Sequence, residues 1–196
     1  ERTGFDFGSK AIDAYNTVML FAAYAGNLDI VKSMIVEGAD DFHNGMLNAA
    51  SQGYINIVEL MLENGANNFN TSMEEASKNG HMDIVKLMME NGAKEFDSIM
   101  EEAAYNGHMD IVQLMLEKGA RDFDSSMVYA AEGGYIDIVK LMIGKGATAL
   151  NEAMENALKK NHLDIFNLML AQGADDFQSA MKYAGYIGNM QIVQNM

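Results

Sequence analysis

The sequence has no cysteine, no proline and no tryptophan among its 196 residues. Without cysteine the chain can form no disulfide and can supply no thiolate, which suits a reducing compartment. Without proline, nothing forbids long stretches of helix. No apolar run approaches the roughly 20 residues that a membrane-spanning helix needs, and no signal-peptide pattern is visible. We therefore expect no membrane contact.

Basic residues are also scarce. Lys and Arg number 13 against 28 Asp and Glu, which gives a formal net charge of −15. Such an excess of negative charge repels nucleic-acid phosphates and anionic membrane surfaces, so no nucleic-acid partner is expected. Apolar residues make up 49% of the chain, which is enough to build a packed core.

An internal repeat of 27 residues is the strongest pattern that is present. Glycine recurs with this period, and asparagine fills the one vacant slot: Gly26, Gly53, Gly80, Gly107, Gly134, Asn161 and Gly188. Both residue types readily adopt the left-handed conformation, so this column is expected to serve backbone geometry. An aromatic residue or leucine opens each repeat: Tyr15, Phe42, Phe69, Phe96, Phe123, Leu150 and Phe177. A methionine column follows: Met19, Met46, Met73, Met100, Met127, Met154 and Met181.

Each repeat encodes two short helices, as residues 69–95 illustrate. Met73 lies on the apolar face of the first helix, which Gly80 ends. A second helix is predicted to start near Asp83, its expected N-cap, and to end at Gly92. Neither helix is long enough to be stable alone in water, so neighbouring repeats must bury each other's apolar faces.

The predicted fold is therefore all-α, an α-solenoid of seven stacked helix–turn–helix repeats. Residues 1–14 form an N-terminal flank and residues 15–196 form the repeat array. The repeats start at residues 15, 42, 69, 96, 123, 150 and 177, and the last one is incomplete.

Residues 103–120, AAYNGHMDIVQLMLEKGA, resemble the middle of an ankyrin repeat, and the same skeleton recurs in all seven repeats. Ankyrin repeats have about 33 residues, so each copy here is roughly six shorter. The missing residues fall after the Gly-Ala pair, where ankyrin repeats carry a projecting β-hairpin. The resemblance implies an ankyrin-like array without hairpins whose first helices face a protein partner.

The variable positions of each first helix lie one, two and five residues after the fixed methionine. They form an exposed stripe opposite the buried face. The stripe is aromatic toward its ends and acidic in its middle, which suits a basic protein partner. The candidate partner-binding residues on this stripe and in the adjoining turns are Phe21, Tyr24, Tyr54, Glu75, Glu102, Tyr105, Tyr129, Tyr135, Tyr183 and Tyr186.

Two glutamates on the stripe have a structural alternative. Thr71 with Glu74, and Ser98 with Glu101, fit the capping box, in which the glutamate satisfies a backbone N–H at the start of a helix. Glu75 and Glu102 have no such capping role, so they are the stronger binding candidates.

The sequence shows no catalytic or metal-binding constellation. There is no phosphate-binding glycine loop and no serine elbow. His81, His108 and His162 share one column, but copies about 10 Å apart cannot hold a common metal. We expect no enzyme activity, no metal and no cofactor. The alternative function is structural, with chains self-associating through the repeat ends into an oligomer or filament.

Overall fold

The computed structural model describes residues 7–187, with side chains from Lys10 to Tyr183. The first helices of the repeats are α1 (Phe7–Ala25), α3 (Phe42–Gln52), α5 (Phe69–Lys78), α7 (Phe96–Asn106), α9 (Phe123–Gly133), α11 (Leu150–Lys159) and α13 (Phe177–Ile187). The second helices are α2 (Leu28–Glu37), α4 (Ile55–Glu63), α6 (Met82–Glu90), α8 (Met109–Lys118), α10 (Ile136–Lys145) and α12 (Leu163–Gln172). From α2 onward the starts of the first helices and of the second helices each recur every 27 residues, which confirms the predicted period. Helix α1 is the exception, because it begins at Phe7 and so includes part of the predicted N-terminal flank.

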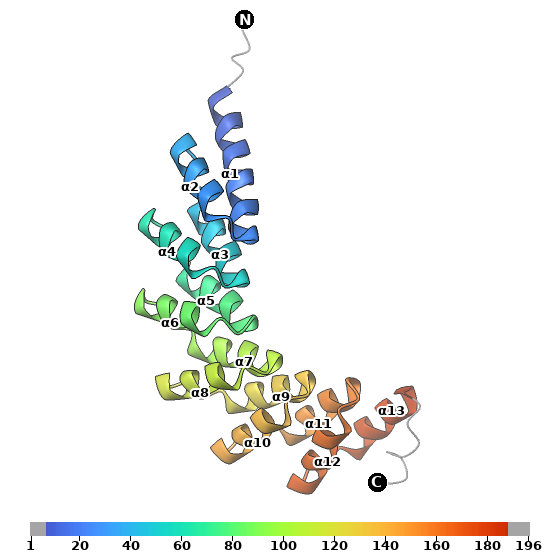
Figure 1. The fold of residues 1–196 in the computed structure, drawn as a ribbon. Coiled ribbons are helices and arrows are strands. Elements are labelled where there is room, and N and C mark those ends of the chain that lie inside the picture. The colour runs from blue at the N-terminus through green and yellow to red at the C-terminus, as the bar shows by residue number, and fades with distance from the viewer. Residues whose placement is uncertain (1–6, 188–196) are drawn as a thin grey trace, which may run out of the picture. The chain divides into compact units, whose positions relative to one another are not determined.

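The chain divides into two compact halves, Glu1–Lys94 and Glu95–Met196. In the N-terminal half, α1, α3 and α5 form one row and α2, α4 and α6 form a second row (Figure 1). In the C-terminal half, α7, α9, α11 and α13 form one row and α8, α10 and α12 the other (Figure 1). Residues 7–187 contain no strand, so the predicted absence of a β-hairpin between repeats is confirmed over that range.

The glycine column turns the chain between the two helices of a repeat, as predicted. Gly134 has φ +88°, and Asn161 has φ +63° at the equivalent position one repeat later. Asn161 is the one non-glycine residue with positive φ within 7–187. Gly188, the last member of the column, lies outside the described residues.

The core of each repeat is built from the fixed columns. Met19, Met46, Met73, Met100, Met127 and Met154 are at most 1% exposed. The expectation is wrong for Met181, which is 53% exposed on α13. In the other repeats, the second helix packs against the first helix and covers the equivalent methionine. The residues that follow α13 in the last repeat lie outside the described ones.

Helix capping differs from the prediction. The N-cap of α6 is His81, and Asp83 lies in the first turn, where its negative charge faces the positive end of the helix dipole. The capping boxes are also wrong, because α5 begins at Phe69 and α7 at Phe96, so Thr71 and Ser98 lie within the helices. The residue before the opening aromatic is the actual N-cap. Asp122, for example, accepts a hydrogen bond from the backbone N–H of Ser125 at 3.0 Å.

In five repeats an Asn or Asp side chain joins the start of the first helix to the loop that leads into the next repeat. We call these the latch residues: Asn16, Asn70, Asp97, Asp124 and Asn151. Each accepts the backbone N–H of the residue 24 positions later, and Asn16, Asp97, Asp124 and Asn151 also accept that of the residue 25 positions later. The latch residues thus satisfy loop N–H groups in a fold where no hairpin supplies partners for them.

Candidate interaction surface

At the start of the N-terminal half, the stripe is apolar and open. Phe21 and Tyr24 on α1 are 72% and 54% exposed. With Thr17, Leu20 and Asn48, they line a hollow of about 360 Å³. Asn48 donates its side-chain N–H to the carbonyl oxygen of Leu20 at 3.2 Å, which fixes α3 against α1.

Farther along the same half, the acidic part of the stripe is partly neutralised. Lys78 forms ion pairs with Glu74 at 2.9 Å and with Glu75 at 3.0 Å. The hydrogen bond that Lys78 donates to Glu74, and then the one that it donates to Glu75, raises the pKa of the Lys78 ammonium above its ordinary value. Glu75 therefore shares one cation with its neighbour and is a weaker binding candidate than the sequence indicated.

The C-terminal half carries an acidic cluster that sequence reasoning only partly identified. Burial raises the pKa of the Glu101 carboxyl, and the negative charges of Asp122, Asp97 and Glu102 raise it further. The neighbouring carboxylates therefore make the surroundings of Glu101 more negative. Glu101 belongs to the candidate surface, although it was set aside in favour of Glu102 because of the capping-box pattern.

Two candidate tyrosines meet beside this cluster. The rings of Tyr105 on α7 and Tyr129 on α9 are packed edge to face, with centroids 6.4 Å apart. They are 37% and 41% exposed, so the pair keeps a large apolar area open to a partner. The contact also fixes the two rings, which lowers the entropy cost of burying them.

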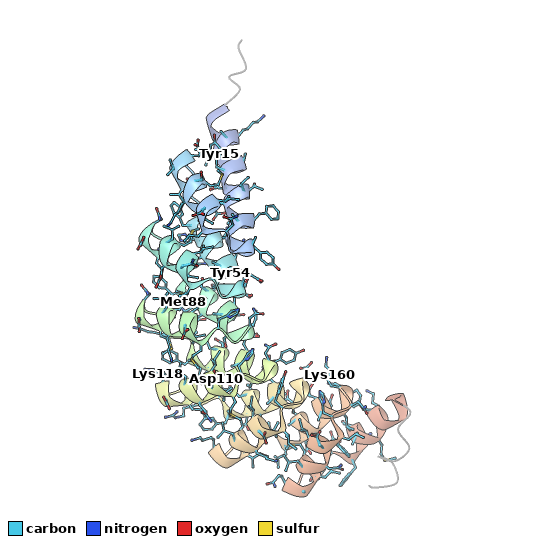
Figure 2. The ribbon with its side chains drawn as sticks, in the orientation of Figure 1. Tyr15, Tyr54, Met88, Asp110, Lys118 and Lys160 are labelled. Carbon is cyan, nitrogen blue, oxygen red and sulfur yellow. The ribbon has the colours of Figure 1, made fainter. Side chains whose placement is uncertain are left out.

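A second hollow of about 310 Å³ adjoins Tyr129 between α9 and α11. Its lining residues are Asp124, Ser125, Val128, Tyr129, Glu132, Ala149, Glu152 and Asn156. Lys160, labelled in Figure 2, lies 3.3 Å from Glu132. Asp124 lines this hollow and is also a latch residue, because it accepts the backbone N–H of Ala149.

The candidate residues in the turns have a structural role. Tyr54, labelled in Figure 2 at the turn between α3 and α4, places its ring under Gly26 of the preceding repeat. A Cβ atom on Gly26 would lie 2.5 Å from that ring. Tyr135 packs under Gly107 in the same way and remains 39% exposed. Glycine in this column therefore serves close ring packing as well as the left-handed turn.

The histidines of the same column make the equivalent contact. The Nε2 atoms of His81 and His162 lie 3.2 Å from the carbonyl oxygens of Ser51 and Glu132 in the preceding repeats. Each imidazole thus joins two repeats. Within the described residues, no group of three His, Asp or Glu side chains is arranged to hold a metal ion.

The aromatic residues at the C-terminal end are partly tied to their neighbours. Tyr183 donates its hydroxyl hydrogen to Glu155 at 2.9 Å, and the ammonium of Lys159 lies 5.2 Å from the centroid of its ring. The hydrogen bond from Lys159, and then that from Tyr183, lowers the pKa of the Glu155 carboxyl. Tyr186 is a residue of α13 whose side chain lies outside the described ones.

A family model describing ankyrin repeats in three copies matches residues 18–99 and 76–180. The chain belongs to the ankyrin repeat family. Its ankyrin fold is also found in 216 chains of solved structures. One of them, the crystal structure of the human ASB11 ankyrin repeat domain, is 22% identical, has a TM-score of 0.64, and is matched over 80% of this chain and 84% of that chain. At this identity the likeness concerns the fold alone. No curated protein matches the sequence.

The resemblance seen in the sequence is thus confirmed. Ankyrin repeats are generally scaffolds for protein–protein interaction and are typically not enzymes. None of the helices within residues 7–187 is both long enough and apolar enough to cross a membrane.

Proposed function

We propose that this ankyrin array is a protein-binding scaffold whose α7–α9 surface takes a basic segment of its partner. The observation that supports this most directly is the acidic cluster around Glu101 beside the Tyr105–Tyr129 pair. A lysine or arginine placed there would relieve the repulsion among the carboxylates. The two tyrosines would supply the apolar contact that holds the segment.

The two parts of this surface have different roles in binding. Glu101 and Glu102 attract a basic segment over a distance and set the rate of association. Tyr105 and Tyr129 become buried on contact and set the rate of dissociation. The remaining candidates are proposed as secondary contacts: Phe21, Tyr24, Tyr54, Glu75, Tyr135, Tyr183 and Tyr186.

A selection of random displayed peptides on the immobilised chain tests this proposal. We expect the selected peptides to be rich in Lys and Arg and to bind more slowly as salt is added, because salt screens exposed charges. Glu102→Lys should slow association several-fold at low salt. Tyr129→Ala should instead increase the dissociation rate about tenfold, which corresponds to the loss of a contact worth roughly 1.4 kcal/mol.

Glu117→Lys is the matched control because it makes the same charge change in the same half, on the second-helix row. Glu117 is exposed near the end of α8, next to Lys118, which Figure 2 labels. This variant should bind the selected peptides almost unchanged. If Glu117→Lys abolishes binding and Glu102→Lys does not, the contact surface lies on the second helices and the proposal is wrong. Selection of acidic or uncharged peptides would also contradict it.

A further inference from the structure

The first repeat begins differently from those that follow it. Helix α1 runs without interruption through Ala11 and Ile12, whereas the equivalent residues one repeat later are the left-handed Gly38 and the loop residue Ala39. Asp13 and Ala14 also lie inside α1. Their equivalents, Asp40 and Asp41, donate their backbone N–H groups to a latch residue. The loop and latch that join the other repeats are therefore absent before α1.

In the later repeats of each half, one face of the first helix packs against the first helix of the preceding repeat. Helix α1 has the corresponding face. On α9, a Cβ atom at Gly133 would lie 2.2 Å from the carbonyl oxygen of Tyr105 on α7. The side chain of Asn48 bonds to the backbone of α1, and the hydroxyl of Tyr183 bonds to Glu155 on α11. The residues of α1 at these two positions are Ala25 and Phe21.

Burial identifies the same face. The residues equivalent to Val18 are buried where a preceding repeat packs on them within the same half: Gly45, Ser72, Ser126, Ala153 and Ala180. Val18 itself is 45% exposed. On the second helix, Ile30 is 40% exposed, whereas Ile57, Ile84, Ile138 and Ile165 are at most 2% exposed. Within the described residues, the stacking face of the first repeat is therefore uncovered.

Along α1 this face is apolar at every position. We call it the α1 seam, and its residues are Ala11, Ala14, Val18, Phe21 and Ala25. Their spacing alternates between three and four residues, which is the pattern of a helix that packs lengthwise against another helix. At the positions equivalent to Phe21 and Ala25, the second repeat has Asn48 and Gln52. An apolar seam of this length is therefore particular to α1.

We propose that the α1 seam is the interface of a two-fold dimer in which α1 packs antiparallel against α1 of a second copy. The sizes of the side chains favour this occupant. In a single antiparallel register, Val18 faces the second copy's Ala14 and Phe21 faces the second copy's Ala11. Each large side chain then meets a small one, so the two helices can approach closely without voids. Ile30 extends the apolar contact at its rim.

This proposal goes beyond partner binding, and Phe21 is the one residue that the two surfaces share. No residue of the α7–α9 surface belongs to the α1 seam. A two-fold contact also closes on itself, whereas head-to-tail stacking of the repeat ends would continue into filaments. The number of copies in the assembly therefore separates the two kinds of self-association.

Sedimentation velocity of the 196-residue chain tests the dimer. Between about 1 and 200 µM, the mass should rise from the 21.5 kDa of one chain to twice that value and stop there. Val18→Glu should raise the dissociation constant at least tenfold, because two charges would then be buried in the seam. Val36→Glu is the matched control, since Val36 is 85% exposed on α2 and lies off the stacking face. It should leave the dimer unchanged, and both variants should keep their helical circular dichroism.

Engineered cysteines test the register, because the natural chain has none. Ala14→Cys mixed with Val18→Cys should form a disulfide-linked dimer faster than either variant alone, since these two positions face each other. A chain that stays monomeric at about 200 µM would overturn the proposal. So would species that grow beyond two copies, or a Val36→Glu variant that weakens association as much as Val18→Glu. Equally fast linkage of Ala14→Cys to itself would overturn the antiparallel register.

Discussion

Replacing the latch residue Asp124 measures what holds one repeat to the next. Asp124 accepts the backbone N–H groups of Thr148 and Ala149, the second of these at 2.9 Å. Ala149 is the N-cap of α11 and supplies no side-chain cap of its own, so no other group replaces the lost acceptor. Hydrogen bonds to a charged group contribute about 1.5–3 kcal/mol each, and exposure of Asp124 to water reduces that value. We expect Asp124→Ala to lower the free energy of unfolding by about 1–3 kcal/mol.

Asp124→Asn is the natural control, because Asn151 does the same work one repeat later with an amide oxygen. At pH 7 this variant should remain within about 0.5 kcal/mol of the unmodified chain. Urea unfolding followed by circular dichroism measures both variants. An Asp124→Ala variant as stable as the unmodified chain would refute the stabilising role of the latch. An Asp124→Asn variant as unstable as Asp124→Ala would refute the equivalence of the two acceptors.

The pH dependence provides a second measurement on the same residue. The backbone N–H of Thr148, and then that of Ala149, lowers the pKa of the Asp124 carboxyl. A lowered folded-state pKa contributes stability above the unfolded value of about 3.9, and this contribution is lost as pH falls through the folded value. The stability difference between the unmodified chain and Asp124→Asn should therefore shift against the unmodified chain below about pH 4. A difference that stays constant down to pH 2 would contradict this reasoning.

Three further changes test the core and the turns by urea unfolding. Met100 is fully buried, so Met100→Ala should cost about 2–4 kcal/mol, and a cost below about 1 kcal/mol would contradict its place in the core. Asn161→Gly should be neutral or stabilising, since Asn161 has a positive φ that glycine adopts without strain; a clear loss of stability would refute this. The Ser126 hydroxyl is buried without a hydrogen-bond partner, so Ser126→Ala should stabilise the chain by up to about 1 kcal/mol. The reverse change at the equivalent position, Ala153→Ser, should destabilise the chain. A less stable Ser126→Ala variant together with a more stable Ala153→Ser variant would refute the argument.

The fold could be predicted from the sequence because every structural feature was encoded several times. A single Asn161 would be weak evidence for a left-handed turn, but six glycines in the same column made its conformation predictable. The buried methionines were predictable for the same reason. The latch residues were missed, although an Asn or Asp follows the opening residue in five repeats. Their role depends on where the loop 24 residues later lies in space, and helical periodicity carries no information about that distance.

The candidate surface was harder to predict because it depends on contacts between repeats. The sequence did not indicate that the ring of Tyr54 packs under Gly26, because this contact depends on the turn of one repeat lying beneath that of the repeat before it. The pairing of Glu75 with Lys78 could have been anticipated, because residues three apart share one face of a helix. The raised pKa of Glu101 could not, since Asp122 approaches it from the loop that leads into the next repeat.

The latch recognises only main-chain atoms in the loop that it holds. The five loop residues that donate to it first are Asp40, Lys94, Arg121, Thr148 and Asp175, which share neither charge nor size. A segment of 27 residues that starts at the opening residue therefore carries both the latch acceptor and the loop that donates to it, whatever its other side chains are. Tandem duplication or loss of a segment that carries a latch residue would preserve this contact, so the length of the array can change by recombination without compensating substitutions in the loop.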